Sequence, residues 1–187
     1  MSENSERFVV ITGGPGSGKS SLIANIRDRG YVTAEEAGRA VIQDQVAIQG
    51  RALPWADRQL FAELMLSFDM RTYHTAEQSS GAVFFDRGVP DVLGYLSLCG
   101  LPVPEHVRRA ADVFRYKRTV FVAPPWQEIF HQDRERKQDF AEAVRTYDAM
   151  LETYTALQYE VIEIPRASVE DRVQFVLESS GVQKSHR

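Results

Sequence analysis

The sequence is short of the residues that several classes of site require. It holds one cysteine, Cys99, so no disulfide can form within the chain and no metal site can be built from cysteine ligands. Cys99 follows an apolar stretch, which predicts a small buried residue rather than a nucleophile. His74 and His131 have no partner at the spacing of metal ligands, so ordinary surface or core histidines are expected.

Long apolar runs and an excess of basic residues are also missing. No run approaches the roughly 18 apolar residues that a membrane-spanning helix needs. The polar segment 1–7 lacks the apolar core of a signal peptide. The formal net charge is −4, so no basic field favours nucleic acid or anionic lipid as a partner. These absences predict a cytoplasmic protein with neither a membrane nor a nucleic-acid partner, and nothing in the sequence indicates an oligomeric state.

One segment carries a specific chemical signal. Residues 8–12 are apolar and β-branched, as in a buried parallel strand, and residues 20–29 place their apolar side chains at helical spacing. Between them, GGPGSGKS at 13–20 fits the pattern GxxxxGK[ST] of phosphate-binding loops. Strand, loop and helix in this order are the context that the pattern requires. A glycine-rich turn that binds nothing is therefore the weaker interpretation.

The residue types in this loop suit a nucleoside triphosphate bound with Mg²⁺. Glycines allow consecutive backbone N–H groups to turn toward phosphate oxygens, and the following helix adds its N-terminal dipole. Lys19 is expected to bridge the β- and γ-phosphates, and the Ser20 hydroxyl to ligate Mg²⁺. The residues predicted to bind ATP are Gly13, Gly14, Pro15, Gly16, Ser17, Gly18, Lys19, Ser20 and Ser21.

The remainder of the chain alternates between strands and helices. Its 187 residues suffice for one substantial α/β domain, residues 1–187, and scarcely for two. Further strands are predicted at 31–34, 82–85, 119–123 and 160–164, and further helices at 37–48, 56–78, 90–99, 104–115, 140–159 and 169–178. This alternation predicts a parallel sheet with helices on both faces, in which ligands bind beyond the carboxyl ends of the strands.

Charged residues follow directly after two of these strands. Asp86 ends the apolar run 82–85, a position from which a carboxylate can reach the shell of a bound Mg²⁺. Arg87 beside it is expected to hold a phosphate or the charge that develops during transfer. The alternative for Asp86 is a carboxylate that caps the next helix.

The acidic pair at 35–36 follows the second strand. Phosphorylation of a hydroxyl requires a carboxylate that orients the hydroxyl or accepts its proton, so one of the two acids can serve. We assign catalysis to Glu35 and substrate binding to Glu36, with two plain first-turn acids as the alternative. Arg39 lies one helical turn further on and either steers an anionic group of the acceptor or pairs with one of these acids.

The segment at about 132–140 contains no apolar side chain before Phe140. Arg134, Arg136 and Lys137 are cations that are able to close over the β- and γ-phosphates and exclude water, as in the lid of a phosphotransferase. A solvated charged surface is the alternative.

Taken together, these motifs resemble a known family. The loop 13–20, EEAGR at 35–39, FDRG at 85–88 and the Arg134/Arg136 pair occur in the order seen in small P-loop ATPases and kinases typified by the ribosylnicotinamide kinase domain. More broadly, the chain is similar to nucleoside and nucleotide kinases, thymidylate kinase included. The resemblance spans essentially the whole chain.

This resemblance implies a P-loop NTPase fold, a three-layer αβα sandwich with a five-stranded parallel sheet in the order 2-3-1-4-5. It also implies helices that bind the acceptor, at about 40–80 and 90–115, and a lid. By the same resemblance, Asp86 serves catalysis or Mg²⁺, Arg87 and Arg39 contact the acceptor or a phosphate, and Arg134 and Arg136 close on ATP. Together with Lys19 of the loop, Asp86, Arg87, Glu35, Arg134 and Arg136 are the predicted catalytic residues.

Two classes of function fit these observations. The first is a kinase that moves the γ-phosphoryl group of Mg-ATP to a small-molecule acceptor, a nucleoside or nucleotide. The second is a regulatory ATPase or nucleotide switch that acts on a protein partner. A GTPase is disfavoured because the segment after Asp86 lacks the glycine three residues on and no Asn-Lys-x-Asp segment is present.

Overall fold

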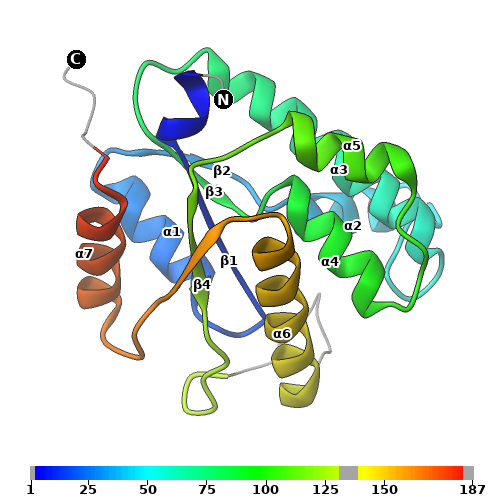
Figure 1. Cartoon of the computed structure of the whole chain (residues 1–187). Coiled ribbons are helices and arrows are strands. Elements are labelled where there is room, and N and C mark those ends of the chain that lie inside the picture. Colours follow the sequence, from blue (N-terminus) through cyan, green and yellow to red (C-terminus); the bar gives the residue numbers. More distant parts are fainter. Residues whose placement is uncertain (1–2, 131–138, 183–187) are drawn as a thin grey trace.

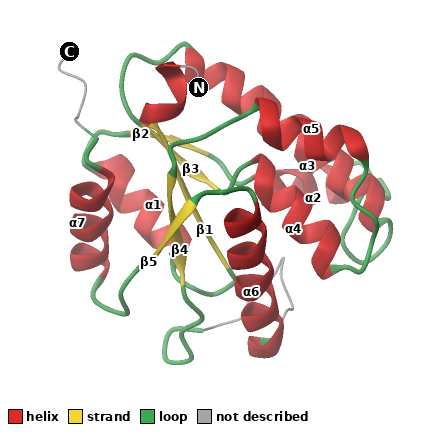
Figure 2. Ribbon diagram, viewed as in Figure 1, coloured by secondary structure: helices red, strands yellow, loops and turns green. Residues whose placement is uncertain are grey.

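The computed structural model describes residues 3–130 and 139–182. At its centre lies a parallel sheet of five strands in the order β2-β3-β1-β4-β5, which confirms the predicted order (Figures 1 and 2). The strands are β1 (Phe8–Gly13), β2 (Val32–Ala34), β3 (Val83–Asp86), β4 (Thr119–Ala123) and β5 (Glu160–Glu163).

Helices cover both faces of this sheet. They are α1 (Lys19–Asp28), α2 (Ala37–Ala47), α3 (Arg58–Glu77), α4 (Val89–Leu98), α5 (Glu105–Val113), α6 (Phe140–Ala156) and α7 (Val169–Ser180), preceded by a 3₁₀ turn, η1 (Glu3–Arg7). Helices α1 and α7 lie together on one face, and α2 to α6 lie on the other (Figure 1). Within the described residues, no helix combines the length and the hydropathy needed to cross a membrane.

The apolar run of β1 supplies both halves of the core. Phe8 and Val10 pack with residues of α3 and α4, whereas Val9 and Ile11 pack with α1 and α7. This division follows from the alternation of side chains along a strand, and burial of each such side chain contributes about 1.5–3 kcal/mol. A strand that is buried on both faces has to be apolar throughout, as residues 8–11 are.

The register of the strands brings the predicted site residues to one edge. Ile11 of β1 lies beside Asp86 of β3, and Gly13 at the end of β1 lies beside Ala123 of β4. Ala34, the last residue of β2, lies beside Phe85. The phosphate-binding loop, the acidic pair at 35–36 and Asp86-Arg87 therefore leave the sheet at the same end, as expected for parallel strands.

Candidate functional site

The phosphate-binding loop connects β1 to α1 and packs tightly against neighbouring backbone. A Cβ atom on Gly13 would lie 2.4 Å from the Ala123 carbonyl oxygen, and one on Gly14 would lie 2.3 Å from the Ala143 carbonyl oxygen of α6. Both contacts are with backbone, which cannot move aside easily. These glycines are therefore required by the close approach of β4 and α6 as well as by phosphate binding.

Lys19 begins α1 and is 5% exposed. Its ammonium donates hydrogen bonds to the carbonyl oxygens of Gly13 (3.1 Å) and Gly14 (2.8 Å) and to the Ser17 hydroxyl (3.3 Å). The ammonium charge of Lys19 is thus held across the loop by the carbonyl oxygens of the loop itself. A phosphate that binds the loop meets a lysine already positioned within reach.

A cavity of about 630 Å³ opens beside the loop, and we call it the nucleotide cavity. It is lined by Pro15, Gly16, Ser17, Gly18, Lys19, Ser20, Ser21, Glu36, Arg39, Trp126, Ile129, Phe130, Arg166, Ala167, Ser168, Val169 and Arg172. Phosphate-binding backbone lies at one end, and aromatic and apolar side chains lie toward the segments after β4 and β5. This combination of a polar cradle and an apolar slot suits a nucleotide.

Arg172 of α7 packs against the phosphate-binding loop. The side chain is 2% exposed, its guanidinium donates to the Ser17 carbonyl oxygen (2.9 Å), and it lies 5.9 Å from the centre of the Trp126 ring. Burial lowers the pKa of Arg172 from its ordinary value. The sequence analysis missed this residue, because α7 is distant from the loop in the sequence.

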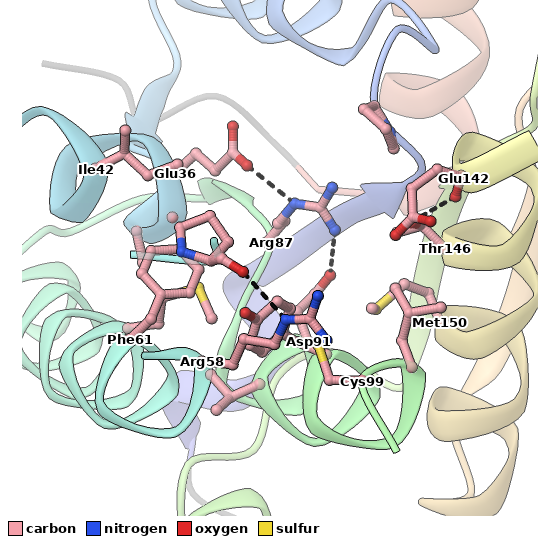
Figure 3. Close-up of a pocket in the computed structure, with 18 of the residues that line it drawn as sticks. Glu36, Ile42, Arg58, Phe61, Arg87, Asp91, Cys99, Glu142, Thr146 and Met150 are labelled. Carbon is pink, nitrogen blue, oxygen red and sulfur yellow. Dashed lines mark hydrogen bonds and ion pairs between the residues drawn. The ribbon is translucent and has the colours of Figure 1, made fainter. Parts of the chain in front are cut away.

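A network around Arg87 connects the loop to the face of the sheet that α2 to α6 cover (Figure 3). Arg87 Nε contacts Glu36 Oε1 (3.2 Å), Nη1 donates to Asp91 Oδ1 (2.9 Å) and Nη2 donates to the Gly13 carbonyl oxygen (2.8 Å). Burial lowers the pKa of Arg87, but the charges of Glu36, Asp91 and Asp86 outweigh this effect and leave the pKa above its ordinary value. Arg87 is therefore a permanent cation at the junction of three segments.

Asp91 in the first turn of α4 completes this network. Its Oδ1 also accepts a hydrogen bond from the Thr12 hydroxyl (2.5 Å), and its Oδ2 accepts from the Tyr154 hydroxyl (2.6 Å) and the Gly88 amide (3.0 Å). A buried carboxylate with this many donors is well satisfied. Asp91 was absent from the sequence prediction, although its place five residues after Asp86 was a signal that could have indicated it.

A second cavity of about 580 Å³ lies on the other side of Glu36, and we call it the acceptor cavity after the role that we propose for it below (Figure 3). Residues from α2, α3, α4 and α6 line it: Pro15, Glu36, Ala37, Gly38, Ile42, Pro54, Trp55, Arg58, Phe61, Met65, Asp69, Arg87, Asp91, Val92, Tyr95, Leu98, Cys99, Asp139, Glu142, Arg145, Thr146 and Met150. Pro15 and Glu36 line both cavities, so the two adjoin at the phosphate-binding loop.

The predicted residues differ in where the structure places them relative to the two cavities. Glu35 is exposed and lines neither cavity, and Arg39 lines the nucleotide cavity rather than the acceptor cavity. Asp86 is 7% exposed and lines neither cavity, but its charge helps to raise the pKa of Arg87. Arg134 and Arg136, predicted for the lid, lie outside the described residues.

Two further expectations about the acceptor side need correction. Cys99 is not fully buried, because it borders the acceptor cavity next to Tyr95, and burial raises the pKa of its thiol. The expected acceptor helices are only part of the lining: α5 contributes no residue, whereas α6 contributes Glu142, Arg145, Thr146 and Met150, and its N-cap residue Asp139 also lines the cavity. No local sequence motif predicted that α6 packs across the loop.

Comparison with known proteins assigns the chain to a family. A family model described as "AAA domain" (AAA_28) matches residues 8–172. The chain belongs to this family. A comparison with curated proteins gives no match.

Solved structures share the fold of this AAA-domain protein. NadR protein in complex with NR superposes with a TM-score of 0.69 at 18% identity, over 96% of this chain and 53% of the NadR chain. Deoxyadenosine kinase from M. mycoides with bound dATP has a TM-score of 0.62 at 12% identity, over 92% of this chain and 98% of the kinase. Thymidylate kinase from Ehrlichia chaffeensis has a TM-score of 0.62 at 13% identity, over 92% and 97%.

These similarities establish a kinase-like P-loop NTPase fold, as the sequence resemblance implied. The chain spans about half the length of the NadR chain that it matches, at 53%. At such identities the likeness concerns the fold, and the chemistry has to be argued from the residues of this chain.

Proposed function

We propose that this protein transfers the γ-phosphoryl group of Mg-ATP to a small-molecule acceptor, a nucleoside or nucleotide. The observation that carries the proposal is the pair of adjoining cavities, one containing the phosphate-binding loop and the other lined by helices, which meet at Glu36 and Pro15. Two reactants bound in adjoining cavities are brought to the same point, which is the main requirement of phosphoryl transfer. A NadR structure of the same fold holds NAD and AMP-PNP, which supports ATP as the donor.

In this proposal the loop residues bind and neutralise the phosphates. The loop amides and the N-terminus of α1 hold the β- and γ-phosphates, and Lys19 moves from the loop carbonyls to phosphate oxygens. Arg87 donates to the carbonyl of Gly13, so its positive charge lies next to the phosphate site. Charge neutralisation of this kind is the dominant contribution in phosphoryl transfer.

The residues present fit a magnesium ion. The Ser20 hydroxyl lines the nucleotide cavity and is an oxygen ligand of the kind that Mg²⁺ prefers. Asp86, which ends the strand beside β1 but lines neither cavity, is proposed as the second. Mg²⁺ at such sites usually takes its remaining ligands from phosphates and water. When bound, Mg²⁺ supplies charge neutralisation at the phosphates.

Glu36 is the carboxylate in the best position to act on the acceptor. It lines both cavities, and its Oε1 contacts Arg87 Nε at 3.2 Å, which fixes the side chain toward the junction. We propose that Glu36 orients the acceptor hydroxyl and accepts its proton as transfer proceeds. Arg134 and Arg136 are proposed to close over ATP from the segment before α6.

The test is a panel of nucleosides, nucleoside monophosphates and sugars, each incubated with Mg-ATP and assayed for ADP formation. A kinase gives a strong increase in ADP with one acceptor over the background of hydrolysis. Uniform slow hydrolysis across the panel would contradict the proposal and favour the regulatory ATPase that acts on a protein partner.

Lys19→Ala provides the decisive variant in this assay. We expect it to lower acceptor-dependent turnover by about 10²–10³-fold, because a charge that stabilises the transferring phosphoryl group is lost. Lys117→Ala is the matched control, since Lys117 contacts Glu6 of η1 and lines neither cavity, so this variant should retain the wild-type rate. Equal turnover in the two variants would refute the role of Lys19.

A further inference from the structure

The buried side chain of Asp69 places a carboxyl group in the wall of the acceptor cavity. Phe61, Met65 and Asp69 follow one another at four-residue spacing on α3, so they share one face of the helix, and all three line the cavity. Asp69 is only 6% exposed. No described residue forms a hydrogen bond or an ion pair with its side chain, although Asp91, Glu36, Arg87 and Tyr116 lie near enough to interact electrostatically. An acid on the apolar face of a helix is unfavourable unless a ligand supplies its partner.

The surroundings of Asp69 favour the protonated form of its carboxyl group. Burial, together with the negative charge of Asp91, raises the pKa of Asp69 well above its ordinary value; Arg87 opposes this, and Glu36 adds to it. A protonated carboxyl group presents one O–H donor and one adjacent acceptor oxygen. It can therefore pair with a ligand edge that carries a donor beside an acceptor, as the rings of nucleosides do.

The charges of the acceptor cavity disfavour an anionic ligand. Its lining includes five acids and three arginines: Glu36, Asp69, Asp91, Asp139 and Glu142 against Arg58, Arg87 and Arg145. Each of these arginines already has a partner. Arg87 is held by two carboxylates and a carbonyl, Arg145 pairs with Glu142, and Arg58 donates to the Pro54 carbonyl oxygen at 3.1 Å. The phosphate of a nucleoside monophosphate would have to displace these contacts, in a cavity where four acids face three arginines even with Asp69 uncharged.

We propose that Asp69 recognises the acceptor, an uncharged nucleoside rather than a nucleoside monophosphate, through a pair of hydrogen bonds to the polar edge of its base. This inference rests on the proposed function and names the substrate class of the same site. The walls beside Asp69 suit a flat ring, because Phe61, Met65, Tyr95 and Met150 supply aromatic and thioether surfaces.

Binding can be measured directly and independently of catalysis. Isothermal titration calorimetry of the whole protein would use adenosine, guanosine, cytidine and uridine, in ribose and deoxyribose forms, and their 5′-monophosphates. Purine riboside and pyrimidin-2-one riboside complete the set, because their bases lack a hydrogen-bond donor. We expect at least one nucleoside to bind, and its monophosphate and the donor-free riboside to bind at least about tenfold more weakly.

Substitutions of Asp69 then identify the recognising group. Asp69→Leu should weaken nucleoside binding at least about tenfold, because it removes both hydrogen-bonding atoms. Asp69→Asn keeps a donor and an acceptor and should stay within a few-fold of wild type. Glu63→Leu, on the same helix but outside the cavity, is the matched control. The melting temperature of Asp69→Leu without ligand should not fall, which separates recognition from a structural role.

Each result decides the inference. Wild-type affinity in Asp69→Leu, equal affinity for the monophosphate, or no binding by any nucleoside would overturn it. The proposed function is decided separately by ADP formation. A nucleoside that binds through Asp69, together with uniform slow hydrolysis across the whole acceptor panel, refutes the phosphotransferase and retains nucleoside recognition by Asp69. Acceptor-dependent ADP formation that is unchanged in Asp69→Leu refutes the inference and retains the phosphotransferase.

Discussion

At the scale of single residues, the site depends on how Arg87 is held. Its φ of 72° lies in the left-handed region, which a residue with a side chain rarely adopts. Such a conformation persists only where the surroundings determine it, and here Glu36, Asp91 and the Gly13 carbonyl do so. The unusual backbone turns the guanidinium back toward the loop, which places its charge at the junction of the two cavities.

The adjacent acids Glu35 and Glu36 offer a matched comparison. We expect Glu36→Gln to lower the kcat of acceptor-dependent ADP formation by about 10²-fold or more, because an amide cannot accept the proton of the acceptor hydroxyl. Glu35→Gln should remain close to the wild-type rate, since Glu35 is exposed and lines neither cavity. Melting temperatures of both variants control for folding. A larger loss in Glu35→Gln would return the catalytic role to Glu35.

Asp69 also makes a prediction about stability and pH. Its pKa in the folded protein is raised, so above about pH 4 the unfolded chain loses this proton while the folded protein keeps it. The carboxyl group therefore lowers the free energy of unfolding as the pH rises toward the folded-state pKa, by at most about 1.4 kcal/mol per pH unit.

Asp69→Asn removes this titration and provides the measurement. Its free energy of unfolding, from urea denaturation, should match wild type most closely near pH 4 and exceed it increasingly toward pH 7. The acids near Asp69 remain in the variant, so the difference between the two proteins isolates this one group. A difference that is constant with pH would show that Asp69 titrates normally.

At the scale of elements, the position of α6 determines the shape of both cavities. Its backbone at Ala143 approaches the loop so closely that a Cβ on Gly14 would lie 2.3 Å from the carbonyl oxygen. The same helix supplies Glu142, Thr146 and Met150 to the acceptor cavity. The loop and the acceptor cavity are thus coupled through a single helix.

Gly14→Ala tests this coupling. The added methyl group should push α6 from the loop, lower stability by about 1–3 kcal/mol through overpacking, and weaken ATP binding. Gly50→Ala is the control, because the nearest atoms to its added Cβ belong to the flexible side chain of Gln45 rather than to backbone. Thermal unfolding and calorimetric titration with ATP measure the two effects. Wild-type stability and affinity in Gly14→Ala would contradict the close packing of α6 on the loop.

At the scale of the whole molecule, the two tryptophans divide between the two cavities. Trp55 lines the acceptor cavity and Trp126 lines the nucleotide cavity. The chain has no other tryptophan, since its total is 2. Fluorescence can therefore follow each cavity separately in single-tryptophan variants.

We expect Mg-ATP to change the emission of Trp126 in the Trp55→Phe variant, because the nucleotide fills the cavity that Trp126 lines. The acceptor should change the emission of Trp55 in the Trp126→Phe variant for the same reason. Titrations excited at 295 nm, where nucleosides absorb little, measure both responses. A response of Trp55 to Mg-ATP as large as that of Trp126 would contradict the separation of the two sites.

The amino-acid sequence by itself determined the nucleotide side of this protein. A phosphate-binding loop is made of consecutive residues, and its conformation follows from its own glycines and from the strand and helix next to it. The order of strands and helices is equally local, because each one follows from the spacing of its apolar residues. Residues 13–20 and the alternation of elements could therefore be predicted without a structure.

Only the tertiary structure decided the acceptor side. Glu36 and Glu35 are neighbours with the same chemistry, and packing against Arg87 distinguishes them. Asp69, Asp91 and Arg172 meet the site from helices far apart in the chain, and α6 replaces α5 in the cavity wall. Such contacts carry no local pattern, because side-chain packing between distant segments creates both the cavity and the burial that changes the protonation of Asp69.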